Sequence, residues 1–238
     1  MKPQRRDAMK TLLIALSALT ITAAQAATIE QIDAATNAMD LKQLASYAAE
    51  QTADYNNAYA NYRLSIMAGI TGKKDQAEQA LDLAQSTLEQ LTAAQPQADH
   101  LALLSSVYGM QIGNNPVKGA LYGPKSNKAM AQAAELEPAN PRVTLVKAII
   151  AYNTPAVFGG SKQSAIELSS KAIELYAQPC QQICWGHAEA YTWRGLAKQE
   201  LGDKAGALAD WTKATEVEPS YGWAKFLLTQ QQSYSQNR

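Results

Sequence analysis

The sequence predicts an all-α protein made of stacked helix–turn–helix pairs. In the clearest pair, residues 188–221, small residues alternate with bulky ones around a Gly-Asp turn, and a proline ends the unit after about 34 residues. The spacing from the turn glycine to two alanines of the second helix is the same at residues 58–91. Strictly alternating β-branched runs, which are typical of half-buried strands, are absent from the sequence. Because one such pair cannot bury its apolar face alone, we expect the pairs to stack into a solenoid.

The first 26 residues have the pattern of a cleavable export signal. Basic residues precede an apolar run at 12–23, and Ala24-Gln25-Ala26 follows as a small-x-small cleavage site. The run is too short for a comfortable membrane span. We therefore expect cleavage after Ala26, a periplasmic or secreted protein, and a mature chain (27–238) that forms a single solenoid domain without a membrane span. Arg5-Arg6 leaves the twin-arginine route as an alternative to ordinary secretion.

The charge of the mature chain bears on its partners. After cleavage it would carry 17 basic and 20 acidic residues. Nucleic acid and anionic lipid both require clustered Lys and Arg, so this mildly acidic balance argues against either as the main partner. We expect a protein or peptide of the cell envelope instead, and the sequence does not indicate an oligomeric state.

The expected pairs follow one another along the chain. Residues 28–52 look like a degenerate pair with a break near Asp40, and residues 58–91 form the next pair. Residues 222–234 look like a closing helix, whose Gln-rich outer face suits the end of a solenoid. In total, the sequence predicts about four to five helix pairs plus a C-terminal capping helix.

Two central pairs carry insertions between their first and second helices. The first insertion is rich in Gly and Pro, and the second contains the run Pro-Ala-Val-Phe-Gly-Gly. Long connections on a scaffold of short ones are often functional. The expected helices are 99–109 and 126–136, then 142–152 and 161–175, and the insertions are 110–125 and 153–160.

The clearest pair resembles the tetratricopeptide repeat (TPR), and the run 137–175 is similar to a group of exported bacterial TPR-like proteins in which a Pro…Phe-Gly-Gly turn splits one repeat. The resemblance implies a right-handed superhelical solenoid with a concave binding surface, and thus a role in holding a partner. It implies no activity. The residues that carry the first resemblance are Tyr191, Gly195, Leu201, Gly202-Asp203, Ala207, Trp211, Ala214 and Pro219.

Cys180 and Cys184 are the only cysteines. In an exported protein, such a closely spaced pair usually forms a structural disulfide. A redox pair is the alternative, although redox pairs are usually spaced C-x-x-C beside a strand–helix unit. Metal binding is less favoured, because His187 is the only nearby histidine and a zinc site needs four ligands.

Motifs of catalysis are missing from the sequence. His100 and His187 are the only histidines, and there is no G-x-S-x-G, H-E-x-x-H, P-loop or G-x-G-x-x-G. The acidic residues are scattered along helix faces, where solvation and i,i+4 pairing are their ordinary roles. We therefore expect neither an enzyme, nor a cofactor, nor a metal.

Aromatic residues point to a binding surface. In a TPR-like stack the first helix of each pair lines the concave side, and at residues 55–71 this helix would expose a stripe of Tyr55, Tyr59, Tyr62 and Ile66. Tyrosine offers a rigid apolar body with a polar tip, as binding surfaces often do, although core packing is the alternative. The same register places six further residues in the groove: Arg142, Leu145, Tyr152, Glu189, Thr192 and Leu196.

These observations favour an exported adaptor that binds a peptide or protein in its concave groove. The alternative is a small-ligand carrier or transporter accessory protein with a pocket under the insertions 110–125 and 153–160. A large apolar cavity there would favour the carrier, and an open groove would favour the adaptor. An enzyme without a recognisable motif is a third, less favoured hypothesis.

Overall fold

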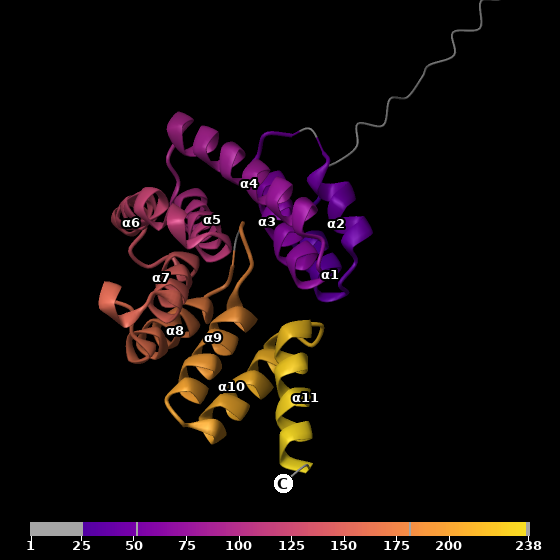
Figure 1. Cartoon of the computed structure of the whole chain (residues 1–238), viewed down its shortest axis with the longest axis vertical. Helices are drawn as coiled ribbons and strands as arrows, with labels where there is room; N and C mark the ends of the chain where they lie inside the picture. Colours follow the sequence, from indigo (N-terminus) through magenta and orange to yellow (C-terminus); the bar gives the residue numbers. More distant parts are fainter. Residues whose placement is uncertain (1–25, 51, 181, 237–238) are drawn as a thin grey trace, which may run out of the picture.

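The computed structural model describes residues 26–50, 52–180 and 182–236. These residues form eleven α-helices, two short 3₁₀ helices and no strand. Successive helices pack against each other as antiparallel pairs (Figure 1). The predicted all-α solenoid is thus confirmed, with five pairs and a closing helix within the described part of the chain. Residues 1–25 of the signal-like segment lie outside it.

The helices have the following bounds, in chain order: α1 Ile29–Asn37, α2 Leu41–Ala48, α3 Tyr55–Ile70, α4 Lys74–Ala94, α5 Ala98–Asn114, η1 Pro116–Lys118, α6 Gly119–Leu136, α7 Pro141–Asn153, η2 Ala156–Phe158, α8 Lys162–Tyr176, α9 His187–Glu200, α10 Lys204–Val217 and α11 Gly222–Gln236.

Local sequence signals set most of the helix starts. The Asp203 carboxylate accepts a hydrogen bond from the backbone N–H of Gly206 at the start of α10. Asn140 caps α7 in the same way, and Pro141 occupies the first position of that helix. Gly72 and Gly202 occupy equivalent turns and both have positive φ, 77° and 89°. A side chain would be strained in this conformation, which explains a glycine at both turns.

The last pair shows how small residues allow two helices to cross closely. Ala207 of α10 is buried, and a Cβ added to Gly195 of α9 would lie 2.5 Å from Nε1 of Trp211. Trp211 itself is fully buried and fills the space beside this crossing. The repeat register predicted for residues 188–221 is therefore the register of the structure.

The two insertions differ from expectation in how much helix they contain. The sequence predicts a Gly- and Pro-rich connection at 110–125, but α5 continues to Asn114 and α6 already begins at Gly119. The 3₁₀ turn between them is capped by Asn115, whose side chain accepts a hydrogen bond from the backbone N–H of Val117. This cap redirects the chain over only a few residues, and α6 accommodates Pro124 in its interior. The insertion 153–160 is shorter and contains η2.

The solenoid curls until its two ends meet. The Asn37 side-chain amide, at the end of α1, donates to Glu218 Oε1 at 2.5 Å, across 181 positions in the sequence. Figure 1 shows the start of α11 next to α1. The inner side of the curl is therefore enclosed by elements from both ends of the chain. Among the described helices, none is long and apolar enough to cross a membrane.

Candidate functional site

The inner side of the solenoid is the candidate site, because the first helices of the pairs converge there. The connection from α8 to α9, residues 177–186, also lies on this side. In Figure 1 it rises from the start of α9 to a tip between α3 and α5. The part of the inner side formed by α3 and α5 is thus covered by the protein's own chain.

Trp185 anchors this connection, which we call the inner loop (177–186). Its ring stacks on Tyr59 with the ring centroids 5.5 Å apart, and its Nε1 donates to the hydroxyl of Tyr55 at 2.8 Å. The Tyr176 hydroxyl donates to the carbonyl oxygen of Trp185 at 2.8 Å. Gly186 turns the chain into α9 with φ of 102°, and any side chain there would clash with Tyr176. The end of the inner loop, Trp185-Gly186, is therefore packed into the core.

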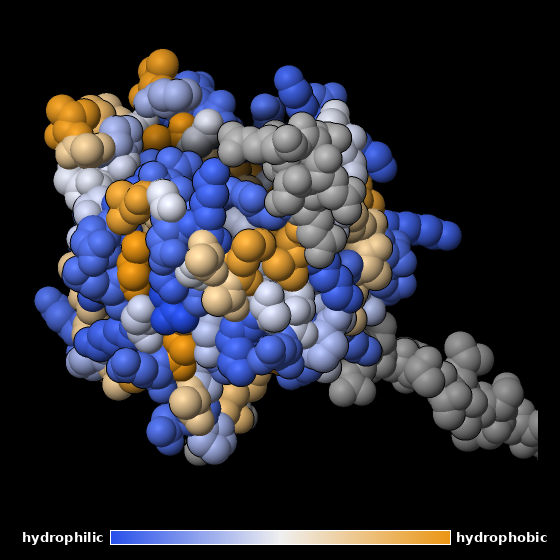
Figure 2. All heavy atoms as spheres, turned by 90° about the horizontal axis from the view of Figure 1, so that it is seen from below, coloured by the Kyte–Doolittle hydropathy of each residue, from blue (hydrophilic) through white to orange (hydrophobic). Residues whose placement is uncertain are grey.

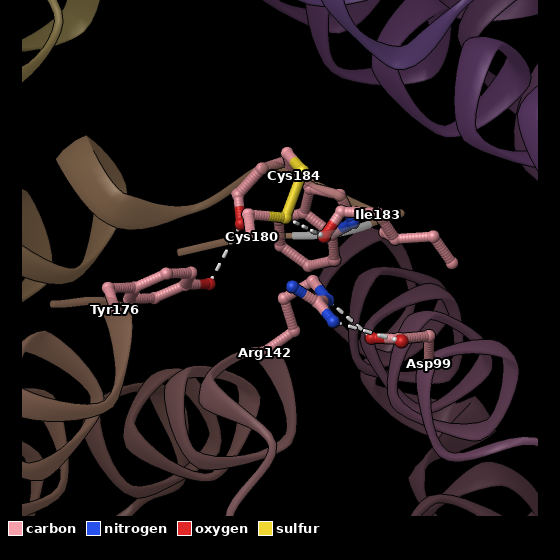
Figure 3. Close-up of a disulfide and its surroundings, with 7 residues drawn as sticks. Asp99, Arg142, Tyr176, Cys180, Ile183 and Cys184 are labelled. Carbon is pink, nitrogen blue, oxygen red and sulfur yellow. Dashed lines mark hydrogen bonds and ion pairs between the residues drawn. A yellow bond between two sulfur atoms is a disulfide. The ribbon is translucent and has the colours of Figure 1, made fainter. Parts of the chain in front are cut away.

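A disulfide joins Cys180 to Cys184 within the inner loop, as predicted, with their Cα atoms 5.7 Å apart. Figure 3 shows the disulfide above the side chains of Tyr176 and Arg142, with Arg142 paired to Asp99 of α5. Both cysteines lie at the exposed tip of the loop. Among the described residues, no group of His, Cys, Asp and Glu could hold a metal ion.

A buried arginine occupies the centre of the inner side. Arg63 of α3 is 8% exposed, and its Nη2 lies 2.5 Å from Glu189 Oε1 of α9. Its Nε donates to the Tyr59 hydroxyl at 2.8 Å and lies 3.4 Å from Asp33 Oδ1 of α1. The Tyr59 hydroxyl in turn donates to the same Asp33 oxygen at 2.6 Å. This network joins α1 and α3, near the start of the solenoid, to α9 of the last helix pair.

The network contains more acid than base. Burial raises the pKa of Asp33 from 3.8 to about 6, while Arg63 opposes the rise and the nearby Glu189 and Glu218 add to it. Burial also raises the pKa of Glu218. These carboxylates surround one guanidinium, so a proton on Asp33 relieves repulsion at the centre of the fold.

The structure divides the ten predicted groove residues into two groups. Five are buried and five are half-buried, and the predicted stripe on α3 is not exposed at Tyr55 or Tyr59. The physical reason is the inner loop, since Trp185 stacks on Tyr59 and donates a hydrogen bond to the Tyr55 hydroxyl. The buried residues are Tyr55, Tyr59, Leu145, Glu189 and Thr192, and the half-buried ones are Tyr62, Ile66, Arg142, Tyr152 and Leu196.

The part of the inner side beyond the inner loop carries an aromatic cluster that the sequence prediction did not include, apart from Tyr152 and Leu196. The ring of Trp193 makes edge contacts with Tyr152 and Trp223, with centroids 5.2 and 5.0 Å apart. Phe226, one turn further along α11, is 58% exposed. We call Tyr152, Trp193, Leu196, Trp223 and Phe226 the aromatic surface. The repeat period is the signal that could have found it, because Trp223 and Phe226 follow Glu189 and Thr192 by about 34 residues.

Comparisons with known proteins identify the fold. No protein-family model and no curated protein matches the sequence. The structure is similar to that of TTC0263, a thermophilic TPR protein of Thermus thermophilus, with a TM-score of 0.54, 18% identity, and coverage of 80% of this chain and 87% of that one. The protein has a TPR-like fold.

Two further solved structures are similar to this TPR-like protein at lower TM-scores. The HusA haemophore from Porphyromonas gingivalis is 28% identical, with a TM-score of 0.46, and the match covers 71% of this chain and 86% of that one. Cut9–Hcn1 of the APC/C is 16% identical, with a TM-score of 0.47, and the match covers 84% of this chain and 33% of that one.

One surface depression lies beside an insertion of this TPR-like protein. It has a volume of about 280 Å³, between α4, the end of α5 and η1. Its lining is largely polar, and none of it comes from the second insertion. The lining residues are Glu78, Leu81, Gln111, Asn114, Asn115 and Lys118.

Proposed function

We propose that this protein is an exported scaffold that binds a peptide or protein of the cell envelope through the aromatic surface. TPR-like folds are in general protein-interaction scaffolds, and the proposal narrows this role to one location. The observation that carries the proposal is that one part of the inner side is covered and another part is accessible. The inner loop covers the part at α3 and α5, whereas aromatic side chains on α7, α9 and α11 stay partly exposed.

The chemistry of the aromatic surface suits a binding role. Aromatic side chains provide large contact areas at a low cost in conformational entropy, and they are enriched among residues that dominate binding energies. The edge contacts on both sides of Trp193 hold the rings in place before a partner arrives. A preorganised surface of this kind loses less entropy on binding.

Export is supported by the sequence and by the disulfide. Residues 1–26 have the pattern of a signal segment, and a disulfide is stable in oxidising compartments such as the periplasm. These observations favour a partner in the envelope. The alternative, a small-ligand carrier, requires an apolar pocket under both insertions, and the depression at the first insertion is largely polar.

Site-specific photo-crosslinking tests the proposal. A photoreactive phenylalanine analogue replaces Phe226 in cells that export the protein, and mass spectrometry identifies the crosslinked partner. The control carries the analogue at Leu83, an apolar residue of α4 that is 54% exposed and lies outside the aromatic surface. We expect a discrete protein adduct from position 226 alone.

The purified partner then allows a quantitative measurement. We expect Phe226→Ala to weaken binding by about tenfold or more, as truncation of a central aromatic contact does. Leu83→Ala should leave the affinity unchanged, and both variants should retain the helical circular dichroism of the wild type. Equal affinities for the wild type and Phe226→Ala would refute the assignment of this surface.

A further inference from the structure

The aromatic surface contains a row of rings that crosses three helices. Tyr152 of α7, Trp193 of α9 and Trp223 of α11 follow one another with ring centroids 5.2 and 5.0 Å apart, so the row is about 10 Å long at most. Trp193 stands at 62° to Tyr152 and at 80° to Trp223. Rings at such angles form notches and not a flat platform. On the face shown in Figure 2, hydrophobic patches are narrow and lie between hydrophilic side chains. A narrow ligand suits this row better than a broad one.

The indole N–H groups of the row are available to a ligand. The other two indoles of the protein, Trp185 and Trp211, donate hydrogen bonds to groups of the protein itself. Among the described residues, in contrast, none accepts from Nε1 of Trp193 or Trp223, and neither of these atoms is buried. A ligand that covers the rings must therefore supply hydrogen-bond acceptors, because a buried donor without a partner is costly.

The charges at the aromatic surface are balanced within the protein. The Lys162 ammonium donates to the Tyr152 carbonyl oxygen at 2.5 Å and lies 3.5 Å from the centroid of the Tyr152 ring. Burial raises the pKa of Tyr152, and the carboxylate of Glu200 beside its hydroxyl adds to the rise. Lys225 is exposed on α11, and the helical period directs it away from the two aromatic residues of that helix. One cation and one anion at the same ring favour an uncharged occupant, because a charged one would lose its hydration without gaining an unpaired counter-charge.

These features match one backbone conformation. A polyproline II helix has no internal hydrogen bonds, so its carbonyl oxygens remain free to accept from indole N–H groups. Its turn of three residues is about 9 Å long, close to the length of the row. Pyrrolidine rings are apolar and uncharged, and aromatic-lined grooves bind this preformed helix at a low cost in entropy. An α-helical ligand uses its carbonyl groups internally and so offers few acceptors to the two indoles.

We propose that the aromatic surface binds a proline-rich segment of another exported protein in the polyproline II conformation. The inference rests on the proposed function and narrows its partner. Pyrrolidine rings would lie in the two notches beside Trp193, and backbone carbonyl oxygens would accept from Nε1 of Trp193 and Trp223. A glycan also stacks on aromatic side chains, but a sugar ring lies flat on an aromatic face, and the steeply inclined rings leave little flat area.

Fluorescence anisotropy of a labelled oligoproline measures this binding with the processed protein (27–238). The peptide has about ten residues, roughly three turns of the helix. Unlabelled oligoproline, a Gly-Ser peptide of the same length and a hexamer of N-acetylglucosamine serve as competitors. We expect saturable binding that unlabelled oligoproline reverses and that neither of the other two competitors affects.

Two variants test the hydrogen bonds, since Trp193→Phe and Trp223→Phe keep an aromatic ring but lose the N–H donor. Each should weaken oligoproline binding by about two- to tenfold, the usual contribution of one hydrogen bond. The matched control is Tyr47→Phe, which removes the polar tip of a half-buried ring of α2, outside the aromatic surface. Its affinity should equal that of the wild type, and circular dichroism melts should show that all variants fold.

Absence of saturable oligoproline binding up to about 1 mM would overturn the proposal. Equal binding by the wild type and both Trp→Phe variants would overturn it too, as would competition by the Gly-Ser peptide or the hexamer equal to that by oligoproline. Photo-crosslinking separates this inference from the proposed function. An adduct from position 226 without oligoproline binding would refute the proline-rich partner alone, whereas absence of any adduct from that position would refute the scaffold role of this surface.

Discussion

Nε1 of Trp185 donates a hydrogen bond to the hydroxyl of Tyr55 at 2.8 Å, across 130 positions in the sequence. The contact ties the inner loop to α3, and the stacking of Trp185 on Tyr59 extends it. Through Tyr59 it also reaches the ion pairs of Arg63. Trp185 therefore belongs to the same hydrophobic core as Tyr55 and Tyr59.

This role predicts a large loss of stability when Trp185 is truncated. Trp185→Ala should lower the free energy of unfolding by about 3–5 kcal/mol, the usual cost of removing a buried Trp. Trp185→Phe keeps a stacked ring but loses the hydrogen bond to Tyr55, so it should cost less. Urea unfolding followed by circular dichroism measures both variants. A loss of less than about 1 kcal/mol for Trp185→Ala would mean that the loop is not part of the core.

Gly→Ala substitutions should have opposite effects on stability at the helix crossing of the last pair and at an open position. Gly195→Ala should destabilise the protein by about 1–3 kcal/mol, because the added Cβ would lie 2.5 Å from the Trp211 ring. Gly109→Ala, on α5, has no atom within 4 Å of the added Cβ and should stabilise by about 0.5–1 kcal/mol. Ala207→Leu at the same crossing should also destabilise. Thermal melts measure these effects. Equal melting temperatures for Gly195→Ala and Gly109→Ala would contradict the observed helix register.

The disulfide predicts a mass and a stability change. Intact-mass analysis without reductant should show two hydrogens fewer than the reduced chain, and two free thiols in freshly exported protein would contradict the structure. Cys180→Ser/Cys184→Ser should lower the free energy of unfolding by about 2 kcal/mol, the order expected for a short closed loop. Adding reductant should not lower the free energy of unfolding of this double variant any further. It should lower that of the wild type to nearly the value of the variant.

Sequence reasoning predicted the repeat architecture because its signals are local. Gly195, Ala207 and Trp211 lie within one pair, and their spacing alone fixes how its two helices cross. The cover over Tyr55 and Tyr59 was not predictable in this way. Their helical spacing shows that they share one face of α3, but it cannot show which distant segment packs on that face.

The candidate site was predictable only in part for the same reason. The ten predicted groove residues are buried or half-buried in the structure, and the prediction did not recognise Arg63 as the charge at the centre of the inner side. Its partners Asp33 and Glu189 belong to helices far apart in the sequence, which only the curl of the solenoid brings together. The aromatic side chains of α11 had a local signal, the repeat period, but they lie in a helix that the sequence assigns to capping.

The central network predicts how stability depends on pH. Asp33 has a pKa of about 6 in the folded protein, compared with an ordinary value of 3.8. Between these two pH values the folded state therefore binds more protons than the unfolded state, and its stability rises as the pH falls. This contribution is complete below about pH 3.8 and is lost as the pH rises through 6.

Comparison of Asp33→Asn with the wild type isolates this effect. The asparagine retains an oxygen that can accept from Tyr59 and Arg63, but it cannot titrate. Burial lowers the pKa of His100 and His187, which opposes the gain on acidification, and burial of Glu218 adds to it. These groups are present in both proteins, so the difference between the two melting curves reports Asp33 together with its charge interactions with Glu189 and Glu218.

We expect the melting temperature of the wild type, relative to Asp33→Asn, to rise as the pH is lowered from about 7.5 to about 5. Glu135→Gln, at an exposed position of α6, is the control and should follow the wild type at every pH. Parallel curves for the wild type and Asp33→Asn would show that Asp33 has the same pKa in the folded and unfolded chains. The excess of carboxylates around Arg63 would then not be relieved by a proton on Asp33.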